Sequence, residues 1–262
     1  SGLDTSEVES MDFMFYGCSS LATLDLSSFD TSSATSMRSM FEGCSSLATL
    51  DLSNFDSSQV VFTWTSEMNY HGMFFGCSSL KSLDLSGWNT SKMSNMREMF
   101  SGCSSLESLD LSGFDTSKAT DMTDMFSGCS SLTSLDLSSF DTSRVTSMRC
   151  MFSDCCSLQF LGLSSFDTSS VTGMSAMFQS CSSLSFLDLS GFDTSKAMDM
   201  SSMFSGCSSL RAVALGEKFS FNGAKGSRQC NLPKPSGNKL TGLWENQATG
   251  ESYSYDDVPN NV

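Results

Sequence analysis

The sequence has few positive charges. Its 262 residues include 14 Lys and Arg against 29 Asp and Glu, which gives a net charge of −15. Proteins that bind nucleic acid need a basic face, because much of their affinity comes from contacts to phosphate. The same acidity disfavours anionic membrane surfaces. We therefore expect no nucleic acid among the partners of this chain.

Long apolar runs and catalytic motifs are missing as well. No stretch approaches the run of about 18 apolar residues that spans a membrane, so we expect no membrane insertion of this chain. The only histidine, His71, leaves no Ser–His or Cys–His pair for nucleophilic catalysis. The sequence also has no Gly-rich phosphate loop, HExxH motif or nucleotide fingerprint. These absences predict a protein that is not an enzyme and that uses no cofactor and no catalytic metal.

What the sequence does contain is a repeat. The Cys of a Gly-Cys-Ser-Ser-Leu element recurs every 26 residues, with one spacing of 33, at Cys18, Cys44, Cys77, Cys103, Cys129, Cys155, Cys181 and Cys207. A fixed period of this size is typical of a solenoid, whose units stack because one unit alone buries too little apolar surface to fold. The repeat predicts a solenoid over residues 1–216 and a C-terminal cap, linker and small hairpin tail over 217–262.

Each unit predicts a strand and a short helix. Leu109 and Leu111 alternate with polar residues, as in a half-buried strand. Met122, Met125 and Phe126 have the i, i+3, i+4 spacing of one helical face. The expected fold class is α/β, a solenoid with a parallel sheet on its concave face and short helices or 3-10 turns on its convex face. The expected strands are 23–27, 49–53, 82–86, 108–112, 134–138, 160–164, 186–190 and 212–216.

The consensus Leu-x-x-Leu-Asp-Leu-Ser-x-Phe-Asp-Thr-Ser, followed by Val-Thr-x-Met-x-x-Met-Phe-x-Gly-Cys, resembles the 26-residue repeat of bacterial surface proteins in the BspA-like leucine-rich-repeat family. The resemblance implies a non-enzymatic protein, displayed on the bacterial cell surface or secreted, that adheres to an extracellular protein or glycan, of a host or of another cell. Where other leucine-rich repeats place an Asn, this chain has an aromatic residue, which predicts a stacked aromatic spine at Phe29, Phe55, Trp88, Phe114, Phe140, Phe166 and Phe192.

Two periodic columns carry groups that can react or bind. Eight of the eleven cysteines occupy the repeat position, which predicts a buried column of free thiols, although stacked neighbours are also within disulfide reach on distance alone. The column that includes Asp110 can either bind a cation such as Ca²⁺ or accept hydrogen bonds from nearby serines. The column that includes Asp115 is more simply explained by Asx-type bonds to turn amides.

The spacing of 33 marks an insertion near residues 61–75. It brings Trp64, Tyr70 and His71 into the sequence. Insertions in solenoids usually form surface protrusions, and these often bind partners. We therefore take these three residues as candidate partner-binding residues, with the alternative that the aromatic side chains fold back onto their own rung. No second His or Cys supports a metal site at His71.

A second irregularity lies on the outward positions of the expected sheet. Phe160 and Phe186 stand side by side where most other units have Ser or Thr, and Gly162 interrupts the neighbouring Asp column. Adjacent exposed aromatic residues with a polar rim predict a contact patch, so these three residues are further candidates for partner binding. The alternative is that another part of the chain, such as the C-terminal tail, covers them.

The ends of the sequence bear on its context. Residues 1–6 align with 112–117 in the middle of a repeat, so we expect the sequence to be a fragment of a longer protein. The monotony of the exposed positions, mostly Ser, Thr and Asp, favours a second function: a structural spacer in a larger surface protein, with no ligand of its own. The oligomeric state is open.

Overall fold

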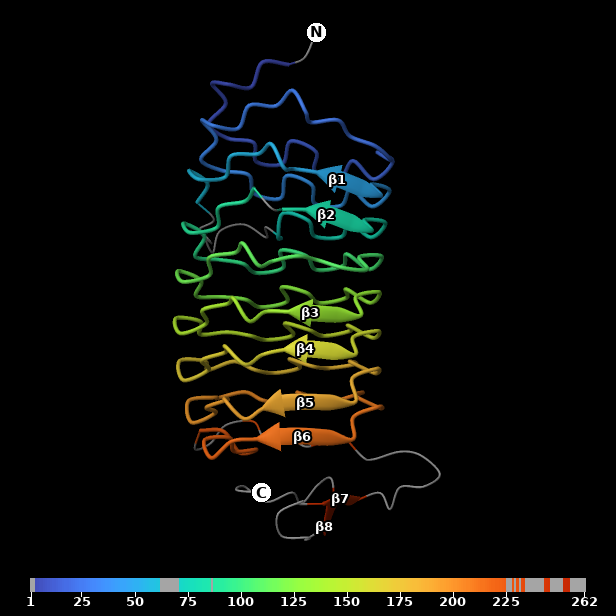
Figure 1. Cartoon of the computed structure of the whole chain (residues 1–262), viewed down its shortest axis with the longest axis vertical. Helices are drawn as coiled ribbons and strands as arrows, with labels where there is room; N and C mark the ends of the chain where they lie inside the picture. Colours follow the sequence, from blue (N-terminus) through green and yellow to red (C-terminus); the bar gives the residue numbers. More distant parts are fainter. Residues whose placement is uncertain are drawn as a thin grey trace.

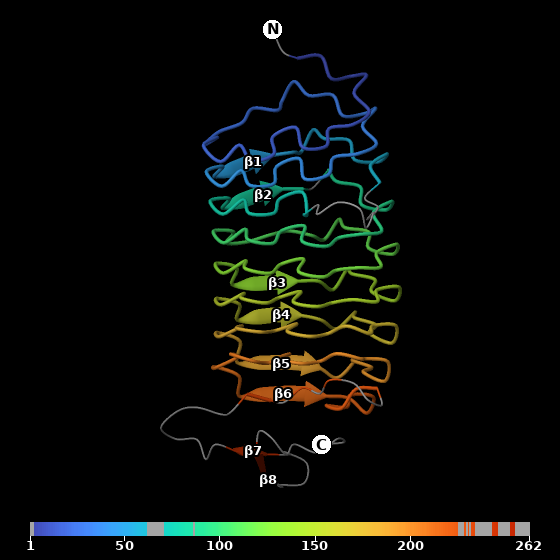
Figure 2. The same ribbon diagram turned by 180° about the vertical axis from the view of Figure 1, so that it is seen from behind.

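Rungs of the repeat are stacked in sequence order into a straight column in this computed structural model (Figures 1 and 2). It describes residues 3–61, 71–85, 87–224, 228, 230, 232–233, 243–245 and 252–254. The stacking of similar rungs confirms the predicted repeat solenoid. The boundary that we place between residues 216 and 217 stays a prediction.

Six short parallel strands lie on one side of the column. They are β1 (Thr49–Asp51), β2 (Ser82–Asp84), β3 (Ser134–Asp136), β4 (Phe160–Gly162), β5 (Phe186–Leu189) and β6 (Ala212–Leu215). The central Leu of β1 lies opposite the central Leu of β2, and both side chains are buried because alternate positions of a strand point inward. The predicted alternation of buried Leu and outward polar residues is therefore confirmed for these strands.

The sheet is less continuous than expected. The strands pair as β1–β2, β3–β4 and β5–β6, and the described segments 23–27 and 108–112 form no strand. On the strand side, the described residues of the β2 rung and the next rung share one backbone hydrogen bond, a long one of 3.4 Å from the Glu107 amide to the Lys81 carbonyl. The rungs therefore stay in register through contacts elsewhere in the unit, and the prediction of one eight-stranded sheet is wrong.

No helix is present among the described residues, so the predicted convex-face helices are wrong there. The segment from Met122 to Cys129 is instead a series of tight turns. Alternate amides donate to carbonyls of the next rung, as Phe126 does to Met151 at 2.9 Å. The amides between them donate three residues back, as Ser127 does to Asp124 at 3.1 Å. We call this segment and its equivalents the turn ladder.

The turn ladder repeats left-handed backbone conformations that a helix does not tolerate. Asp124 has φ 56°, and the equivalent positions in other rungs also have positive φ: Phe13, Ser39, Glu98, Cys150, Ala176 and Ser202. A left-handed residue ends a right-handed helix, and it does so here one residue before the Met-Phe pair. The i, i+3, i+4 spacing of Met122, Met125 and Phe126 therefore reflects the burial of these three side chains on one side of successive turns, and not a helix.

The turn ladder also explains why the column is straight. Solenoids with helices on one face curve because a helix needs more room per rung than a strand. Here backbone hydrogen bonds join successive rungs on the turn side, and strand pairing joins β1–β2, β3–β4 and β5–β6 on the other side, so neither side spreads the rungs farther apart than the other. The strand side is consequently not concave, contrary to the expectation from the sequence.

Aromatic rings fill the centre of the column. The Phe of each Met-Phe pair stacks on its equivalents, with ring centroids 5.6–5.9 Å apart, along Phe15, Phe41, Phe74, Phe100, Phe126, Phe152, Phe178 and Phe204. The predicted aromatic spine is largely buried too, and it stacks at Phe29–Phe55 and Phe166–Phe192, with centroids 6.5 and 6.4 Å apart. The core thus contains two aromatic columns, of which the sequence predicted one as a stack.

Two further columns tie the rungs together through side chains. The buried Thr142 hydroxyl donates to the Asp167 carbonyl at 2.9 Å and accepts from the Asp167 amide at 2.8 Å. The Cys129 thiol donates to the Phe100 carbonyl of the preceding rung at 3.2 Å. All eleven cysteines are free, and those of the repeat are buried except Cys18, which confirms the predicted column of free thiols from the second copy onward.

The last rung is covered by residues that follow the repeat. Phe219, Phe221, Cys230 and Leu232 are buried in the hydrophobic core cluster. The tail contains the predicted hairpin-like pair, β7 (Leu243–Glu245) antiparallel to β8 (Ser252–Ser254). The Trp244 indole N–H donates to the Pro233 carbonyl at 2.9 Å.

Candidate binding face

The outward side of β1–β6 and of the rung between β2 and β3 forms one continuous surface, which we call the sheet face. Its strands alternate exposed, buried and exposed residues, so two columns of side chains project from it. In the N-terminal half one column carries hydroxyls, at Thr49, Ser82, Ser108 and Ser134, and the other carries carboxylates, at Asp51, Asp84, Asp110 and Asp136. The sequence predicted both columns from the alternation alone.

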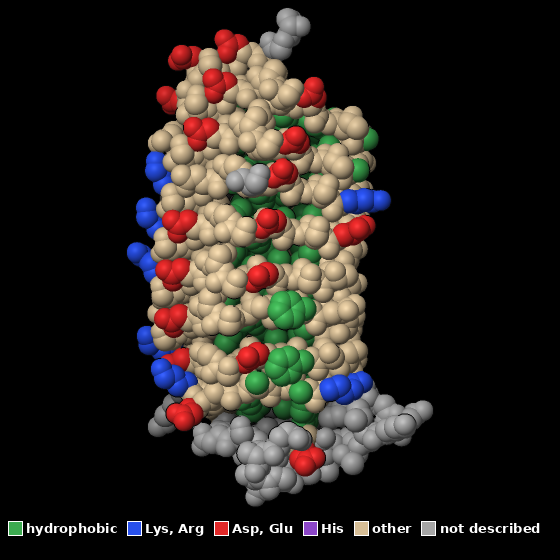
Figure 3. All heavy atoms as spheres, viewed as in Figure 1, with side chains coloured by type: hydrophobic (Ala, Val, Ile, Leu, Met, Phe, Trp, Pro, Cys, Tyr) green, Lys and Arg blue, Asp and Glu red, His purple; other side chains and the backbone are tan. Residues whose placement is uncertain are grey.

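The two candidate aromatic residues project from the C-terminal half of the sheet face. Phe160 begins β4 and is 62% exposed, and Phe186 begins β5 and is 54% exposed. Phe186 lies opposite Ala212 of β6, which is also exposed. Figure 3 shows apolar side chains gathered on this half, with acidic side chains beside them. Both rings are exposed, and the alternative in which the tail covers them concerns residues that lie mostly outside the described ones.

Gly162 lies beside the Phe160 ring. A Cβ atom at position 162 would lie 3.7 Å from Phe160 Cε1, an ordinary contact, and 3.3 Å from Asp136 Oδ1, a tighter one. The absence of a side chain at position 162 therefore leaves the side of the ring and the neighbouring carboxylate uncovered by that residue. The structure thus brings together three of the predicted residues, Phe160, Gly162 and Phe186. We call these three residues, with Ala212, the aromatic patch.

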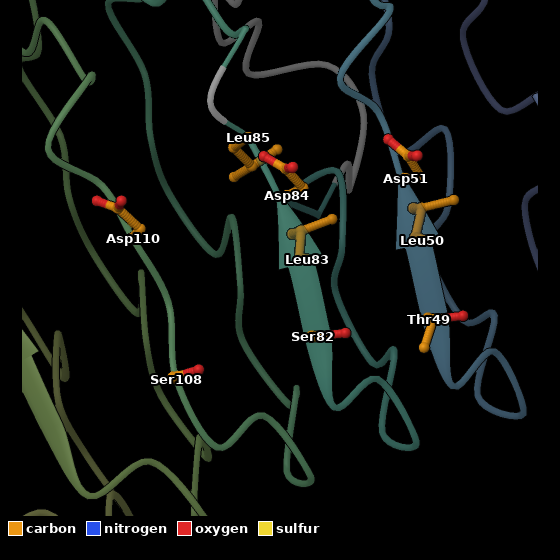
Figure 4. Close-up of a pocket in the computed structure, with 9 residues that line it drawn as sticks. All are labelled: Thr49, Leu50, Asp51, Ser82, Leu83, Asp84, Leu85, Ser108 and Asp110. Atoms are coloured by element: carbon orange, nitrogen blue, oxygen red, sulfur yellow. The ribbon is translucent and has the colours of Figure 1, made fainter. Parts of the chain in front are cut away.

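A hollow of about 450 Å³ lies on the other half of the sheet face, where β2 and the next rung do not pair. Figure 4 shows its two rows of polar side chains, Thr49, Ser82 and Ser108 in one and Asp51, Asp84 and Asp110 in the other. Leu50 and Leu83 lie between the rows, and Leu85 lies beyond the Asp row. The sequence did not indicate this hollow, because the break in strand pairing that produces it has no counterpart in the repeat motif.

The carboxylates of the sheet face accept hydrogen bonds from their own turns. Asp136 Oδ1 accepts from the Ser138 amide at 2.9 Å, and Asp188 Oδ1 accepts from the Ser190 amide at 2.9 Å. The amide and hydroxyl of Ser138 lower the pKa of Asp136, and the hydroxyl and amide of Ser190 lower the pKa of Asp188. These acids are therefore ionised at neutral pH. Of the two interpretations of this column, the structure bears out the hydrogen bonds to serine.

Of the three candidates in the insertion, Trp64 and Tyr70 lie outside the described residues. His71 is described and belongs to the turn side. Its Nδ1 contacts the Glu98 carboxylate, its Nε2 lies 3.9 Å from Glu42 Oε1, and its ring stacks on Phe75 with centroids 4.1 Å apart. The structure therefore does not bring His71 to the aromatic patch.

The buried acids around His71 were missed by sequence reasoning. Glu42 and Glu98 are both buried, and Arg97 Nη2 lies 3.0 Å from Glu98 Oε1. A signal existed, since Glu98 replaces small or short polar residues at most equivalent turn positions, but the contacts of His71 with the two acids join residues 27 or more positions apart. Within the described residues, no group of three or more His, Cys, Asp or Glu side chains is arranged to hold a metal ion.

The fold defines the protein as a repeat solenoid of short parallel rungs. Three segments that together cover residues 1–220 match the family described as "Mycoplasma protein of unknown function, DUF285": 1–68, 67–161 and 136–220. The chain belongs to this family. No curated protein and no solved structure matches it. In the described part of the chain, no helix is long and apolar enough to cross a membrane.

Proposed function

We propose that the chain is a non-enzymatic cell-surface or secreted protein whose sheet face binds an extracellular protein or glycan. The observation that carries the proposal is the exposure of Phe160 and Phe186, at 62% and 54%, where most rungs carry Ser or Thr. Repeated positions are occupied for stacking, so a local departure that exposes large apolar side chains needs another explanation. Contact with a partner is the explanation that uses both rings.

Membership of the BspA-like leucine-rich-repeat group and an extracellular or cell-wall location form part of the proposal. Their support is the repeat motif, with its inward Leu residues at 109 and 111, the latter fully buried, and the Ser, Thr and Asp of its outward positions. The turn ladder is a departure from leucine-rich repeats that place helices opposite the sheet. The resemblance to the BspA-like group therefore rests on the strand side of the unit more than on the turn side.

A structural spacer is the alternative function, and a separate observation favours it. The Thr, Cys and Phe columns run through nearly every rung, so most of the chain serves to keep the column straight and stiff. Such a column is suited to hold another domain away from a surface. On this view the aromatic patch has no partner.

Binding of the whole chain to arrays of extracellular-matrix proteins and glycans tests these functions. The parent is compared with the double variant Phe160→Ser/Phe186→Ser, which restores the residue type of most other rungs. Tyr16→Ser is the matched control, because Tyr16 is an equally exposed aromatic residue outside the sheet face. We expect the double variant to lose binding and the control to keep it. Equal binding by all three proteins contradicts the assignment to the patch, and a parent that binds nothing favours the spacer.

A further inference from the structure

The aromatic patch is bounded by negative charge in its own column of the strands. Asp136 and Asp188 occupy the Asp column on either side of Gly162. Each carboxylate accepts the amide of its serine at Oδ1, and both Asp136 and Asp188 are exposed on the surface. The faces of aromatic rings are themselves electron-rich and attract cations. A cation that approaches the patch therefore meets two favourable surfaces, one aromatic and one ionic.

Positive charge near the patch is limited. The column at the edge of the sheet face contains Lys81 and Arg211, and the Arg211 guanidinium donates to the carbonyls of Ser208 and Leu210 at 3.1 Å each. The same edge column carries Glu107, and the whole chain has a net charge of −15. The long-range field over the sheet face is consequently negative, which concentrates cationic partners and speeds their encounter.

The side chains of the aromatic patch form no hydrogen bonds to the hydroxyls of a sugar. Phe160, Gly162, Phe186 and Ala212 offer no side-chain hydrogen-bond donor or acceptor. Hydroxyls of a glycan on this surface would find acceptors only at the Asp136 and Asp188 carboxylates beside the patch, whereas an apolar side chain gains by burial against the rings. The surface thus favours a protein segment over a glycan.

We infer that the aromatic patch binds a segment of a protein partner in which apolar side chains stand beside Lys or Arg. The apolar side chains cover Phe160 and Phe186, and the cations lie against the ring faces and the Asp136 and Asp188 carboxylates. This inference rests on the proposed function, and it specifies the partner as a basic, apolar protein segment. The exposed carboxylates, the exposed rings and the negative net charge are the three observations that agree on this chemistry.

A synthetic peptide with alternating Leu and Lys between Ser spacers is the probe. Its binding to the whole chain is measured by fluorescence anisotropy at low and high NaCl. We expect Phe160→Ser/Phe186→Ser to weaken binding at least about tenfold, because exposed aromatic anchors dominate such contacts. We expect Asp136→Asn/Asp188→Asn to weaken binding about threefold at low salt and not at high salt, where charges are screened.

The Asn variants keep the turns intact, since the Asn side chain retains an oxygen that can accept the serine amide, as Asn89 does from Ser91. Asp25→Asn/Asp51→Asn is the matched control, because it removes two charges from the same column near the other end of the sheet face. This control should weaken peptide binding less than Asp136→Asn/Asp188→Asn does, since its charges lie several rungs from the patch and charge attraction falls with distance. An equal effect of both Asn pairs would overturn the local ionic contact.

Two peptide arms separate the causes. A peptide with Leu replaced by Ser should lose binding, and equal binding by it would overturn the apolar contact. A peptide with Lys replaced by Glu should also lose binding, and equal binding by it would overturn the cationic contact. If the Leu-Lys peptide does not bind but a matrix protein or glycan binds through Phe160 and Phe186, the basic-segment inference fails while the proposed function stands.

Discussion

At the scale of single residues, the column of buried Thr hydroxyls that bond to the next rung tolerates the least change of side chain. Thr142 supplies both a donor and an acceptor to the backbone of Asp167 in the next rung, and Thr116 does the same for Asp141. Each hydroxyl replaces hydrogen bonds that the Asp backbone groups would otherwise make to water. Removal of one hydroxyl leaves two backbone groups without a partner at the junction of two rungs.

We predict that Thr142→Val lowers the free energy of unfolding by about 2–4 kcal/mol, because it keeps the volume and removes both hydrogen bonds. Urea denaturation followed by circular dichroism measures the change. Thr142→Ser is the matched control, and it should cost less than about 1.5 kcal/mol, since Ser57 already makes the same two bonds to Asn89. Equal losses for Val and Ser would show that the methyl group, and not the hydroxyl, stabilises the junction.

The thiol column makes stability depend on alkaline pH. Burial raises the pKa of Cys77 to about 12 and that of Cys207 to about 12. An unfolded thiol ionises near pH 8.5, so above that pH the unfolded state binds fewer protons than the folded state, and stability falls as pH rises. We predict a loss of about 1.4 kcal/mol per pH unit for each such thiol between about pH 9 and 11.

The effect of the thiols is separated from that of other groups that titrate in the same range by comparing how the free energy of unfolding depends on pH in two proteins. Unfolding by urea at several pH values is measured for the parent and for Cys77→Ala/Cys207→Ala. The double variant should have a shallower dependence on pH, by about 3 kcal/mol per pH unit for two thiols, whatever its stability at pH 7. Parallel curves for the two proteins would contradict ionisation of these buried thiols as the cause.

At the scale of elements, the turn ladder determines what each unit tolerates. Ala176 has φ 56°, and Gly128 has φ 74°. A residue with a Cβ atom in the left-handed region costs about 1–2 kcal/mol relative to glycine. We predict that Ala176→Gly changes stability little or raises it by up to about 1 kcal/mol, because relief of strain outweighs the greater freedom of the unfolded chain.

The opposite change, from glycine to alanine at position 128, is expected to destabilise the protein. In Gly128→Ala the new Cβ would lie 3.5 Å from Gly102 Cα, which is an ordinary contact, so the cost should be the backbone strain of about 1–2 kcal/mol. Thermal melts of both variants measure these shifts. If Ala176→Gly destabilised the protein as much as Gly128→Ala did, left-handed strain would not be what sets the cost of a Cβ atom at these two positions.

The difference between the expected helix and the observed turns has a physical origin. The spacing of Met122, Met125 and Phe126 predicts that these side chains share one side, and all three are buried. Spacing does not reveal where the intervening amides donate. Bonds from Met122, Asp124, Phe126 and Gly128 to the next rung exist only once two rungs are stacked, so one unit read alone favours the helix.

The candidate site was predictable to the extent that it follows from alternation within a strand. The outward direction of Phe160 and Phe186 follows from their place beside inward leucines, and both rings are exposed. The hollow beside β2 and the contact of His71 with Glu98 were not predictable. Both depend on how two rungs meet, and the contact joins residues 27 positions apart.

At the scale of the whole molecule, the protein is a one-dimensional array. The backbone bonds of the turn ladder, the Thr hydroxyls and the Phe stacks all join neighbouring rungs. Stability in such an array is approximately a sum over rungs and their interfaces. Removal of one complete rung should therefore leave the remaining interfaces intact, provided that equivalent positions are rejoined.

Deletion of residues 113–138 tests this. The deletion removes 26 residues and joins Ser112 to Ser139, which occupies the position of Gly113 in the next unit. The inward Leu, the Thr column and the turn ladder all continue in phase, so we predict a folded protein whose melting temperature falls by less than about 10 °C.

Deletion of residues 113–125 removes half a unit and puts turn residues against strand residues, so this variant should not fold cooperatively. Circular dichroism melts and limited proteolysis compare the two, and similar behaviour of both deletions would contradict a stack of equivalent rungs. The aromatic patch lies in β4, β5 and β6, beyond the deleted rung, and Asp110 takes the position of the deleted Asp136. The 26-residue deletion should therefore also keep the sheet-face binding of the parent.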